Sequence, residues 1–281
     1  EQELAMAFSF HHLKVDYKNG DKWSLMEPDL KGLRDLFATW QEEMQDGDGW
    51  NALFLNNHDQ PRAISRFGDD ETYWLESGKM LGLLIHGMRG TPYIFQGEEI
   101  GTPNGGFEGI EDYRDVESKN YYRILLEQGK TKQEALTVLS VRSRDNGRTP
   151  MLWSEKENGG FSQATPWLGF PKKRKGISVE VQSQQKDSIL SFYQKLIQMR
   201  KELSILSDGE IRFLETTEGV IGYERILGNQ HLKVMCNLTK EKQSLSSVNQ
   251  IRGELLLNSY TSSPEEGFLR PFEGWACLWK S

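Results

Sequence analysis

The sequence predicts an α/β fold in which consecutive β/α units form a parallel sheet, followed by a small antiparallel β domain. Short apolar runs alternate with helical patterns along residues 4–96. Each run ends in polar residues, as strands do at the edge of a sheet that carries a site. After Ser207-Asp208-Gly209 the pattern changes to period two, so residues 1–207 and 208–281 are expected to form separate domains. The β/α units fit part of a barrel or of a doubly wound sheet.

The first β/α unit begins with an expected strand at Leu4–Phe10, which ends in the polar cluster His11–Lys14. The following loop contains Asn19–Lys22, a strong turn signal. A helix is predicted over residues 30–44, because apolar residues recur there at helical spacing. Gly47–Gly49 marks its end.

The second unit contains the most informative stretch of the chain. Residues 52–55 form a short apolar run that fits a buried strand. The run ends in a cluster that contains His58, Asp59 and Arg62, and Pro61 stops the strand because it has no amide proton. A buried strand that delivers His and Asp at its carboxyl end is typical of the active-site edge of an α/β barrel. A capped strand end with no catalytic role would give the same local pattern.

The third unit consists of a predicted helix over residues 72–88 and a strand over residues 91–96. The strand ends at Glu98 and Glu99. Because adjacent residues on a strand point to opposite faces, these two carboxylates are expected to be structural and not to act as a pair.

A long charged insertion follows over residues 101–146, with helices predicted at 118–127 and 132–139. Connections of this length are usually functional or have a structure of their own. After an irregular loop over residues 149–170, residues 188–203 form an amphipathic helix. This helix is expected to pack the β domain against the preceding units.

The C-terminal part contains short strand-like runs separated by turns. They lie at residues 211–214, 220–226, 232–238, 254–257 and 275–278. The aromatic residues of this part are expected in its core and not on a sugar-binding platform. Cys236 and Cys277 lie in two of the runs, which predicts buried free thiols and no disulfide.

The composition argues against several classes of function. A formal net charge of −7 argues against nucleic acid or an anionic membrane as the main partner. No window is long and apolar enough to span a bilayer, and no secretory signal is recognisable, so a cytoplasmic location is expected. No phosphate-cradling glycine loop, Ser-His-Asp order or zinc-ligand spacing occurs, so neither a cofactor nor a metal is expected.

Several motifs resemble the α-amylase superfamily of glycoside hydrolases, in its exo-acting α-glucosidase branch. They follow the expected order at Asn57–Arg62, Gly90–Gly101, Tyr113–Glu117 and Arg144–Met151. The resemblance implies the C-terminal part of a (β/α)8 TIM barrel, comprising about its last three β/α units, followed by a small antiparallel β-sandwich domain.

Within that branch, the segments Phe8–Tyr17 and Asn19–Trp23 most resemble the trehalose-6-phosphate hydrolases. Relatives that act on neutral sugars typically carry Glu in place of His11 and an acidic residue near Lys14. A sugar phosphate needs charge-assisted donors beside its pocket, so Lys14 and Lys22 are expected to bind the 6-phosphate of trehalose 6-phosphate. The alternatives are an oligo-1,6-glucosidase or dextran-type α-glucosidase with two solvated loop lysines, and a non-catalytic carbohydrate-binding or transport-associated protein of the same fold.

The resemblance also implies roles for individual residues. Asp59 matches the carboxylate that stabilises the transition state, and His58 would donate a hydrogen bond to the same sugar ring. Arg144 matches an arginine that contacts the non-reducing sugar, with a loop-anchoring ion pair to Asp145 or Asp115 as the alternative. Glu117 matches a position near the leaving-group sugar. Nearby, Arg62 and Arg66 are expected to tie the loop after Asp59.

The resemblance further implies that part of the catalytic machinery lies elsewhere. Retaining α-glucoside hydrolysis needs a carboxylate nucleophile and a carboxylic acid, which in this superfamily come from strands earlier than the first one seen here. We therefore expect the chain to be a fragment whose other barrel half comes from the parent chain. Alone, it is expected to be inactive.

Overall fold

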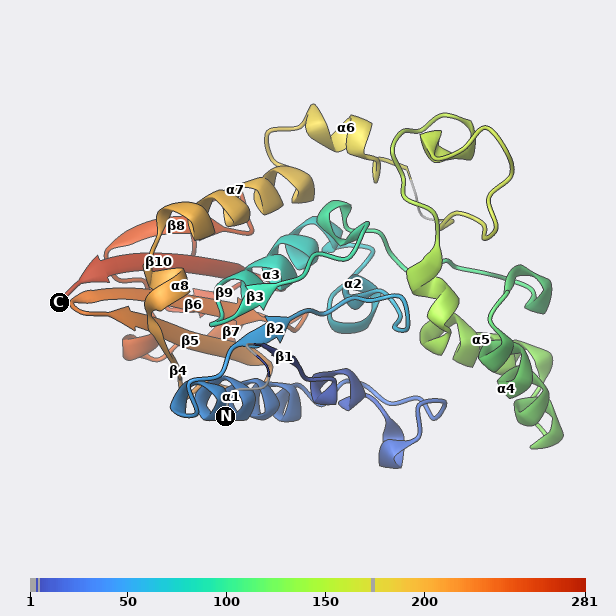
Figure 1. The fold of residues 1–281 in the computed structure, drawn as a ribbon, viewed down its shortest axis with the longest axis horizontal. Helices are drawn as coiled ribbons and strands as arrows, with labels where there is room; N and C mark the ends of the chain where they lie inside the picture. Colours follow the sequence, from blue (N-terminus) through green and yellow to red (C-terminus); the bar gives the residue numbers. More distant parts are fainter. Residues whose placement is uncertain (1–3, 5, 173–174) are drawn as a thin grey trace.

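The computed structural model describes residues 4, 6–172 and 175–281. A helical insertion lies at one end of the molecule and an antiparallel sheet at the other, with a short parallel sheet and its helices between them (Figure 1). Of the expected first strand, Ala5 lies outside the described residues, as does the leading segment 1–3.

The parallel sheet has three short strands in the order β1-β2-β3. They are β1 (Ala7–Phe8), β2 (Asn51–Leu53) and β3 (Thr91–Pro92). Consecutive parallel strands joined by helices confirm the predicted β/α units. The strands are shorter than the apolar runs that predicted them. The outer strands β1 and β3 each pair on one side only. The apolar residues of the predicted runs extend beyond the paired residues.

Two long helices follow β1 and β2, as the periodicity predicts. Helix α1 (Leu30–Asp46) begins where the carboxylate of Asp29 accepts a hydrogen bond from Gly32 N at 2.8 Å. Helix α3 (Trp74–His86) follows β2. Between them in sequence, α2 (Ala63–Phe67) was not predicted, because five residues are too few to show a helical period.

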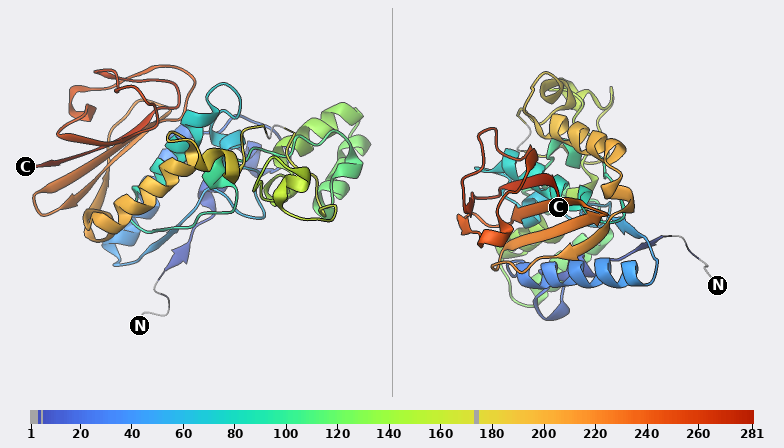
Figure 2. Two further views of the ribbon diagram at one scale, coloured as in Figure 1. Left: turned by 90° about the horizontal axis from the view of Figure 1, so that it is seen from above. Right: turned by 90° about the vertical axis from the view of Figure 1, so that its left-hand side faces the viewer.

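The insertion contains two helices that lie side by side at one end of the molecule (Figure 2). It consists of α4 (Val116–Glu127) and α5 (Lys132–Arg142), which confirms the two helices predicted there. Thr131 and Glu134 form a reciprocal capping box at the start of α5. The insertion has a core of its own, which also contains Trp23 from the loop after β1.

The C-terminal part begins with three helices and continues as an antiparallel sheet. The helices are α6 (Val179–Ser183), α7 (Ile189–Glu202) and α8 (Ile205–Asp208). The five-stranded sheet has the order β4-β5-β6-β10-β8, and a two-stranded sheet pairs β7 with β9. The strands are β4 (Glu210–Phe213), β5 (Val220–Leu227), β6 (Gln230–Asn237), β7 (Gln243–Ser244), β8 (Glu254–Asn258), β9 (Phe268–Leu269) and β10 (Gly274–Lys280). The predicted buried thiols Cys236 and Cys277 are confirmed.

The antiparallel sheet packs on α3, and the expectation that α7 attaches it is wrong. The hydroxyl of Tyr223 donates to Leu84 O at 2.7 Å, and Arg225 Nη1 donates to Gly87 O at 3.1 Å. Helix α3 is buried along its length from Ser77 to His86, so it needs cover on every side. Helix α7 supplies that cover on another face of α3. It comes so close that a Cβ on Gly82 would lie 2.8 Å from the Tyr193 ring.

The central position of α3 predicts a large effect of truncating one of its core side chains. Leu83→Ala is expected to lower the free energy of unfolding by about 2–5 kcal/mol, because Leu83 is fully buried and the cavity can close only partly. Urea unfolding followed by circular dichroism measures this. Val248→Ala is the control, since Val248 is 74% exposed and its truncation should stay within about 0.5 kcal/mol. Equal losses in the two variants would contradict the central role of α3.

Candidate active site

The segment that follows β2 borders an apolar hollow at the open face of the parallel sheet. The hollow has a volume of about 320 Å³, and His58 and Asp59 stand at its rim. Its aromatic wall consists of Phe8, Phe10, Phe54, Tyr93 and Phe95. The rings of Phe8 and Tyr93 are 4.9 Å apart, yet Phe8 is 47% and Tyr93 42% exposed. Such a large exposed apolar surface marks a place where something else binds.

Asp59 is held by two arginines from the segment after α5. Its Oδ1 accepts from Arg148 Nη2 at 2.9 Å and from Arg144 Nη1 at 3.4 Å. Its Oδ2 lies 3.2 Å from His58 Nε2. The loop itself is fixed by Asn57, whose Oδ1 accepts from Asp59 N at 2.8 Å. The side chain of Asp59 remains 46% exposed, so its carboxylate can accept further donors.

Arg144 connects Asp59 to the insertion. Its Nη2 donates to Asp115 Oδ1 at 2.5 Å, and its Nε lies 3.2 Å from Glu117 Oε2. Burial acts to raise the pKa of Asp115, but the hydrogen bonds from Arg144 and Ser118 outweigh it and hold the pKa below its usual value. Arg144 therefore bridges anions from the end of β2 and the start of α4. The ion pair with Asp115 that the sequence offered as an alternative is present together with the contact to Asp59.

The structure brings five of the six proposed site residues into one network and leaves Lys14 outside it. Lys22 Nζ donates to Glu117 Oε2 at 2.8 Å and lies 4.9 Å from the centre of the Trp23 ring. Lys22 is thus already neutralised by an anionic partner. Lys14 lies on the same loop and is exposed, and its ammonium group makes no hydrogen bond or ion pair with any residue in the described ranges. The two lysines, which the sequence treats alike, therefore differ in their availability to a ligand.

Two members of the network were not assigned a site role from the sequence. Arg148 contacts Asp59 directly, and its Nε also donates to His58 O at 2.8 Å. Arg148 lies on the same short 3-10 helix as Arg144, and its closeness to Arg144 in the sequence was the available signal. Asp115 caps α4 by accepting from Ser118 N at 3.1 Å, a role that its place before the helix could have indicated.

A buried ionic cluster supports this network from inside. The carboxylate of Asp16 accepts from Arg66 at 2.6 and 2.8 Å and also binds Arg142 at the end of α5. Arg66 Nη1 additionally donates to Gln60 Oε1 at 2.8 Å, next to Asp59. Burial acts to raise the pKa of Asp16, but the bonds from Arg66 and Arg142 prevail and lower it. One carboxylate thus joins the loops after β1 and β2 to the insertion.

Arg62 ties the same loop to the segment that follows β3. Its Nη1 donates to Gln96 O at 2.7 Å and its Nε to Asn146 O at 3.3 Å. Burial lowers the pKa of Arg62 to about 10, so it stays charged at neutral pH. The expectation that Arg62 and Arg66 tie the loop after Asp59 is confirmed by these contacts.

The adjacent acids Glu98 and Glu99 lie on a single helical turn, Glu98–Ile100, and not at a strand end. The turn forms because Gly97 and Gly101 on either side take positive φ values of 92° and 65°. Glu98 bonds to Asn56, whereas Glu99 accepts from Gly97 N at 2.7 Å. The two carboxylates have separate partners, as expected. The reason is the helical turn, and not the alternation of side chains along a strand.

Among residues 4, 6–172 and 175–281, no group of three His, Cys, Asp or Glu side chains is placed to hold a metal ion. Within the same residues, every helix is too short or too polar to cross a membrane.

Comparison with known proteins gives consistent results. The protein family described as "Alpha amylase, catalytic domain" matches residues 1–209. Trehalose-6-phosphate hydrolase of Escherichia coli (strain K12) is 46% identical over 277 residues, covering 96% of this chain and 50% of that protein. Oligo-1,6-glucosidase of Parageobacillus thermoglucosidasius is 42% identical over 281 residues, covering 97% and 50%.

A solved structure is similar along the whole chain. The crystal structure of Bacillus licheniformis trehalose-6-phosphate hydrolase has a TM-score of 0.95 and 42% sequence identity, covering 100% of this chain and 52% of that one. The chain spans about half the length of the curated relatives it matches.

The buried cluster predicts that Asp16→Asn lowers the free energy of unfolding by about 3–5 kcal/mol, because two buried guanidinium groups lose their carboxylate. Urea unfolding at neutral pH tests this. Since the folded-state pKa of Asp16 lies below its usual value of 3.8, the difference from the wild type should shrink on acidification below that value. Asp35→Asn, which removes an exposed pair with Lys31, should cost at most about 1 kcal/mol. A similarly small effect of Asp16→Asn would contradict the assignment.

Proposed function

This chain belongs to the α-amylase family of glycoside hydrolases, and we propose that it is the C-terminal half of a retaining enzyme that cleaves trehalose 6-phosphate into glucose and glucose 6-phosphate. The observation that carries the proposal is Asp59, which two arginines fix at the rim of an apolar hollow while its side chain stays 46% exposed. Similarity to trehalose-6-phosphate hydrolases over nearly the whole chain supports it. We also propose a cytoplasmic setting, where a charged sugar phosphate is retained.

Asp59 is proposed to stabilise the transition state. A glycosyl cation-like ring develops positive charge, and a fixed carboxylate nearby interacts with it and with the sugar hydroxyls more strongly than in the ground state. Arg144 and Arg148 both donate to Oδ1, and Oδ2 lies 3.2 Å from His58 Nε2, so the carboxylate cannot rotate freely. His58, which is 72% exposed, is proposed to donate to a hydroxyl of the same ring. Arg144 would contact the non-reducing sugar from the other side.

The phosphate is proposed to bind at Lys14. A phosphate dianion gains most from a cation that has no carboxylate of its own, and Lys14 meets that condition among the described residues. Lys22 could join only if the phosphate displaced or shared the bond to Glu117 at 2.8 Å. The Lys22–Glu117 pair is instead placed to present both a donor and an acceptor to hydroxyls of the leaving-group sugar.

The nucleophile and the general acid are proposed to come from the other half of the barrel. The relatives are about twice as long as this chain. The outer strands β1 and β3 each pair on one side only, and Phe8 and Phe10 on the open face are 47% and 51% exposed. We propose that the other barrel half covers this wall and completes the site at the rim.

A neutral-sugar α-glucosidase is the second candidate. The neutralised Lys22 favours it, because one of the two lysines assigned to phosphate is already paired. The similarity to oligo-1,6-glucosidase, at 42% identity, is nearly as high as that to the trehalose-6-phosphate hydrolases.

The first functional prediction concerns the chain alone. The isolated 281 residues should not hydrolyse p-nitrophenyl-α-glucoside 6-phosphate, whereas mixing with the separately expressed N-terminal half of the Escherichia coli relative should restore turnover. Asp59→Asn should reduce the restored kcat by roughly 10²–10³-fold, as the loss of one preorganised electrostatic group does in other enzymes. Asp46→Asn, an exposed change at the end of α1, is the matched control. Turnover by the chain alone, or restored turnover that tolerates Asp59→Asn, would sink the proposal.

The second functional prediction separates the two candidate substrates. In the reconstituted enzyme, Lys14→Ala should raise KM for the phosphorylated substrate by about 10–100-fold, because a charge-assisted bond to phosphate is lost. KM for p-nitrophenyl-α-glucoside should not change. Lys18→Ala removes an exposed lysine of the same loop and should leave both constants unaltered. Equal effects of Lys14→Ala on both substrates would favour the neutral-sugar enzyme.

A further inference from the structure

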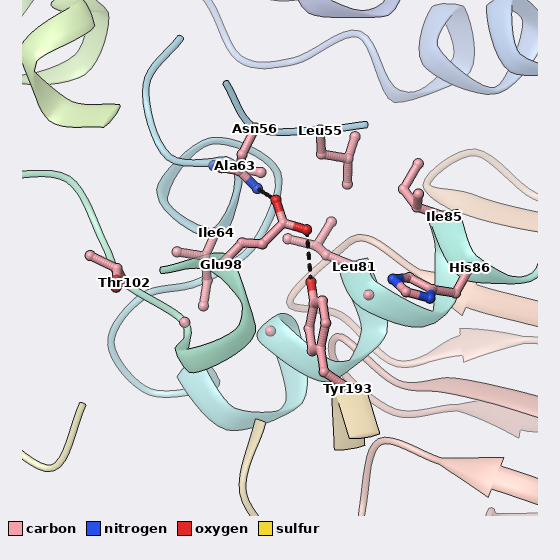
Figure 3. Close-up of a pocket in the computed structure, with 13 residues that line it drawn as sticks. Leu55, Asn56, Ala63, Ile64, Leu81, Ile85, His86, Glu98, Thr102 and Tyr193 are labelled. Atoms are coloured by element: carbon pink, nitrogen blue, oxygen red, sulfur yellow. Dashed lines mark hydrogen bonds between the residues drawn. The ribbon is translucent and has the colours of Figure 1, made fainter. Parts of the chain in front are cut away.

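A small cavity lies beside the loop that carries the candidate site (Figure 3), and it shares no residue with the network around Asp59. Its walls come from the end of β2, helices α2, α3 and α7, and the turn Glu98–Ile100. Its volume of about 20 Å³ is enough for one water molecule.

Glu98 is the central polar group of this cavity. Its Oε2 accepts from Asn56 Nδ2 at 2.7 Å, and the orientation of that amide is fixed because Asn56 Oδ1 accepts from Ala63 N at 2.7 Å. The other oxygen, Oε1, lies 3.4 Å from the Tyr193 hydroxyl, a long and weak contact. The hydrogen bond at Oε2 is therefore the stronger of the two side-chain contacts of this carboxyl group.

Two further polar atoms that line the cavity have no hydrogen-bond partner among the described residues. They are His86 Nδ1 on α3 and Thr102 Oγ1 after the turn. Each side chain is 2% exposed, so bulk water does not satisfy them. Buried polar atoms without partners are uncommon, and an internal water molecule is the usual solution.

Burial favours the neutral form of Glu98, whereas the hydrogen bonds from Asn56 and the Phe95 backbone and the charge of Arg62 favour its carboxylate. Burial is the main cause that raises its pKa to about 8, and the charge of Glu99 acts in the same direction. Arg62 is the nearby cation, but its guanidinium donates to the carbonyls of Gln96 and Asn146. Burial also lowers the pKa of His86 to about 3, which leaves a neutral imidazole, and Tyr193 on α7 is neutral as well.

We propose that this cavity holds one resident water molecule and that Glu98, in its neutral acid form, donates a hydrogen bond into it. A protonated carboxyl group has a donor to place, and a water molecule in the cavity can accept it. Asn56 links this site to the loop, since it bonds Glu98 and stands two positions before His58. The protonation of Glu98 thereby becomes part of the anchor of the His58-Asp59 loop.

The test of the neutral acid is the pH dependence of stability. Because the folded-state pKa of Glu98 is about 8 and its usual value is 4.5, its contribution is complete below 4.5 and is lost as the pH rises to 8. Between pH 6.5 and 8, where His86 is neutral in the folded and largely in the unfolded chain, the folding equilibrium constant should fall by up to about tenfold per pH unit. Glu98→Gln should flatten this slope, and the exposed control Glu127→Gln should retain it. Equal slopes in wild type and Glu98→Gln would overturn the proposal.

Two further measurements on the wild-type chain make the test independent of how well the variant folds. Carboxyl carbon NMR should show one glutamate that titrates near pH 8, and titration of every glutamate below pH 6 would overturn the neutral acid. A crystal structure should show one water molecule within hydrogen-bond distance of the Glu98 carboxyl group. An empty cavity there would overturn the water site.

Discussion

The arrangement of the candidate site depends on the carboxylate of Asp16 and the two arginines that hold it. Arg66 follows β2 and Arg142 ends α5, so three segments far apart in the sequence meet at one anion. A parallel sheet of such short strands cannot position these loops by backbone hydrogen bonds alone. Buried ion pairs add little net stability over a well-packed apolar contact, but they demand particular geometry, and geometry is what the site needs.

The apolar and polar parts of the molecule have different tasks. Helix α3 lies between α7 and the antiparallel sheet and supplies the continuous core. The insertion carries its own smaller core and is joined to the rest partly through charged side chains, including the pair Lys22–Glu117. The network around Asp59 forms where the insertion meets the rest of the molecule. Neither the insertion nor the rest would therefore hold Asp59 and Arg144 together alone.

Much of this could be predicted from local pattern. Helices α1, α3 and α7 have a clear period, and the fold class and family follow from strand ends and motifs in order. The attachment of the sheet to α3 has no plain apolar signal, because the buried residues of α3 include Ser77, Lys79 and His86. The pairing of Lys22 with a residue 95 positions away has no local signal. Likewise, the turn at Glu98 depends on two glycines with positive φ, Gly97 and Gly101, and not on a pattern of apolar residues.

The outer strands β1 and β3 have one further consequence. Each presents unpaired backbone groups beside exposed aromatic rings, and such edges can template another strand of any origin. Chains of this kind at high concentration have a route to mutual association by edge pairing and apolar contact. Whether such chains stay dispersed in solution or associate would then depend on which surface binds the open face first.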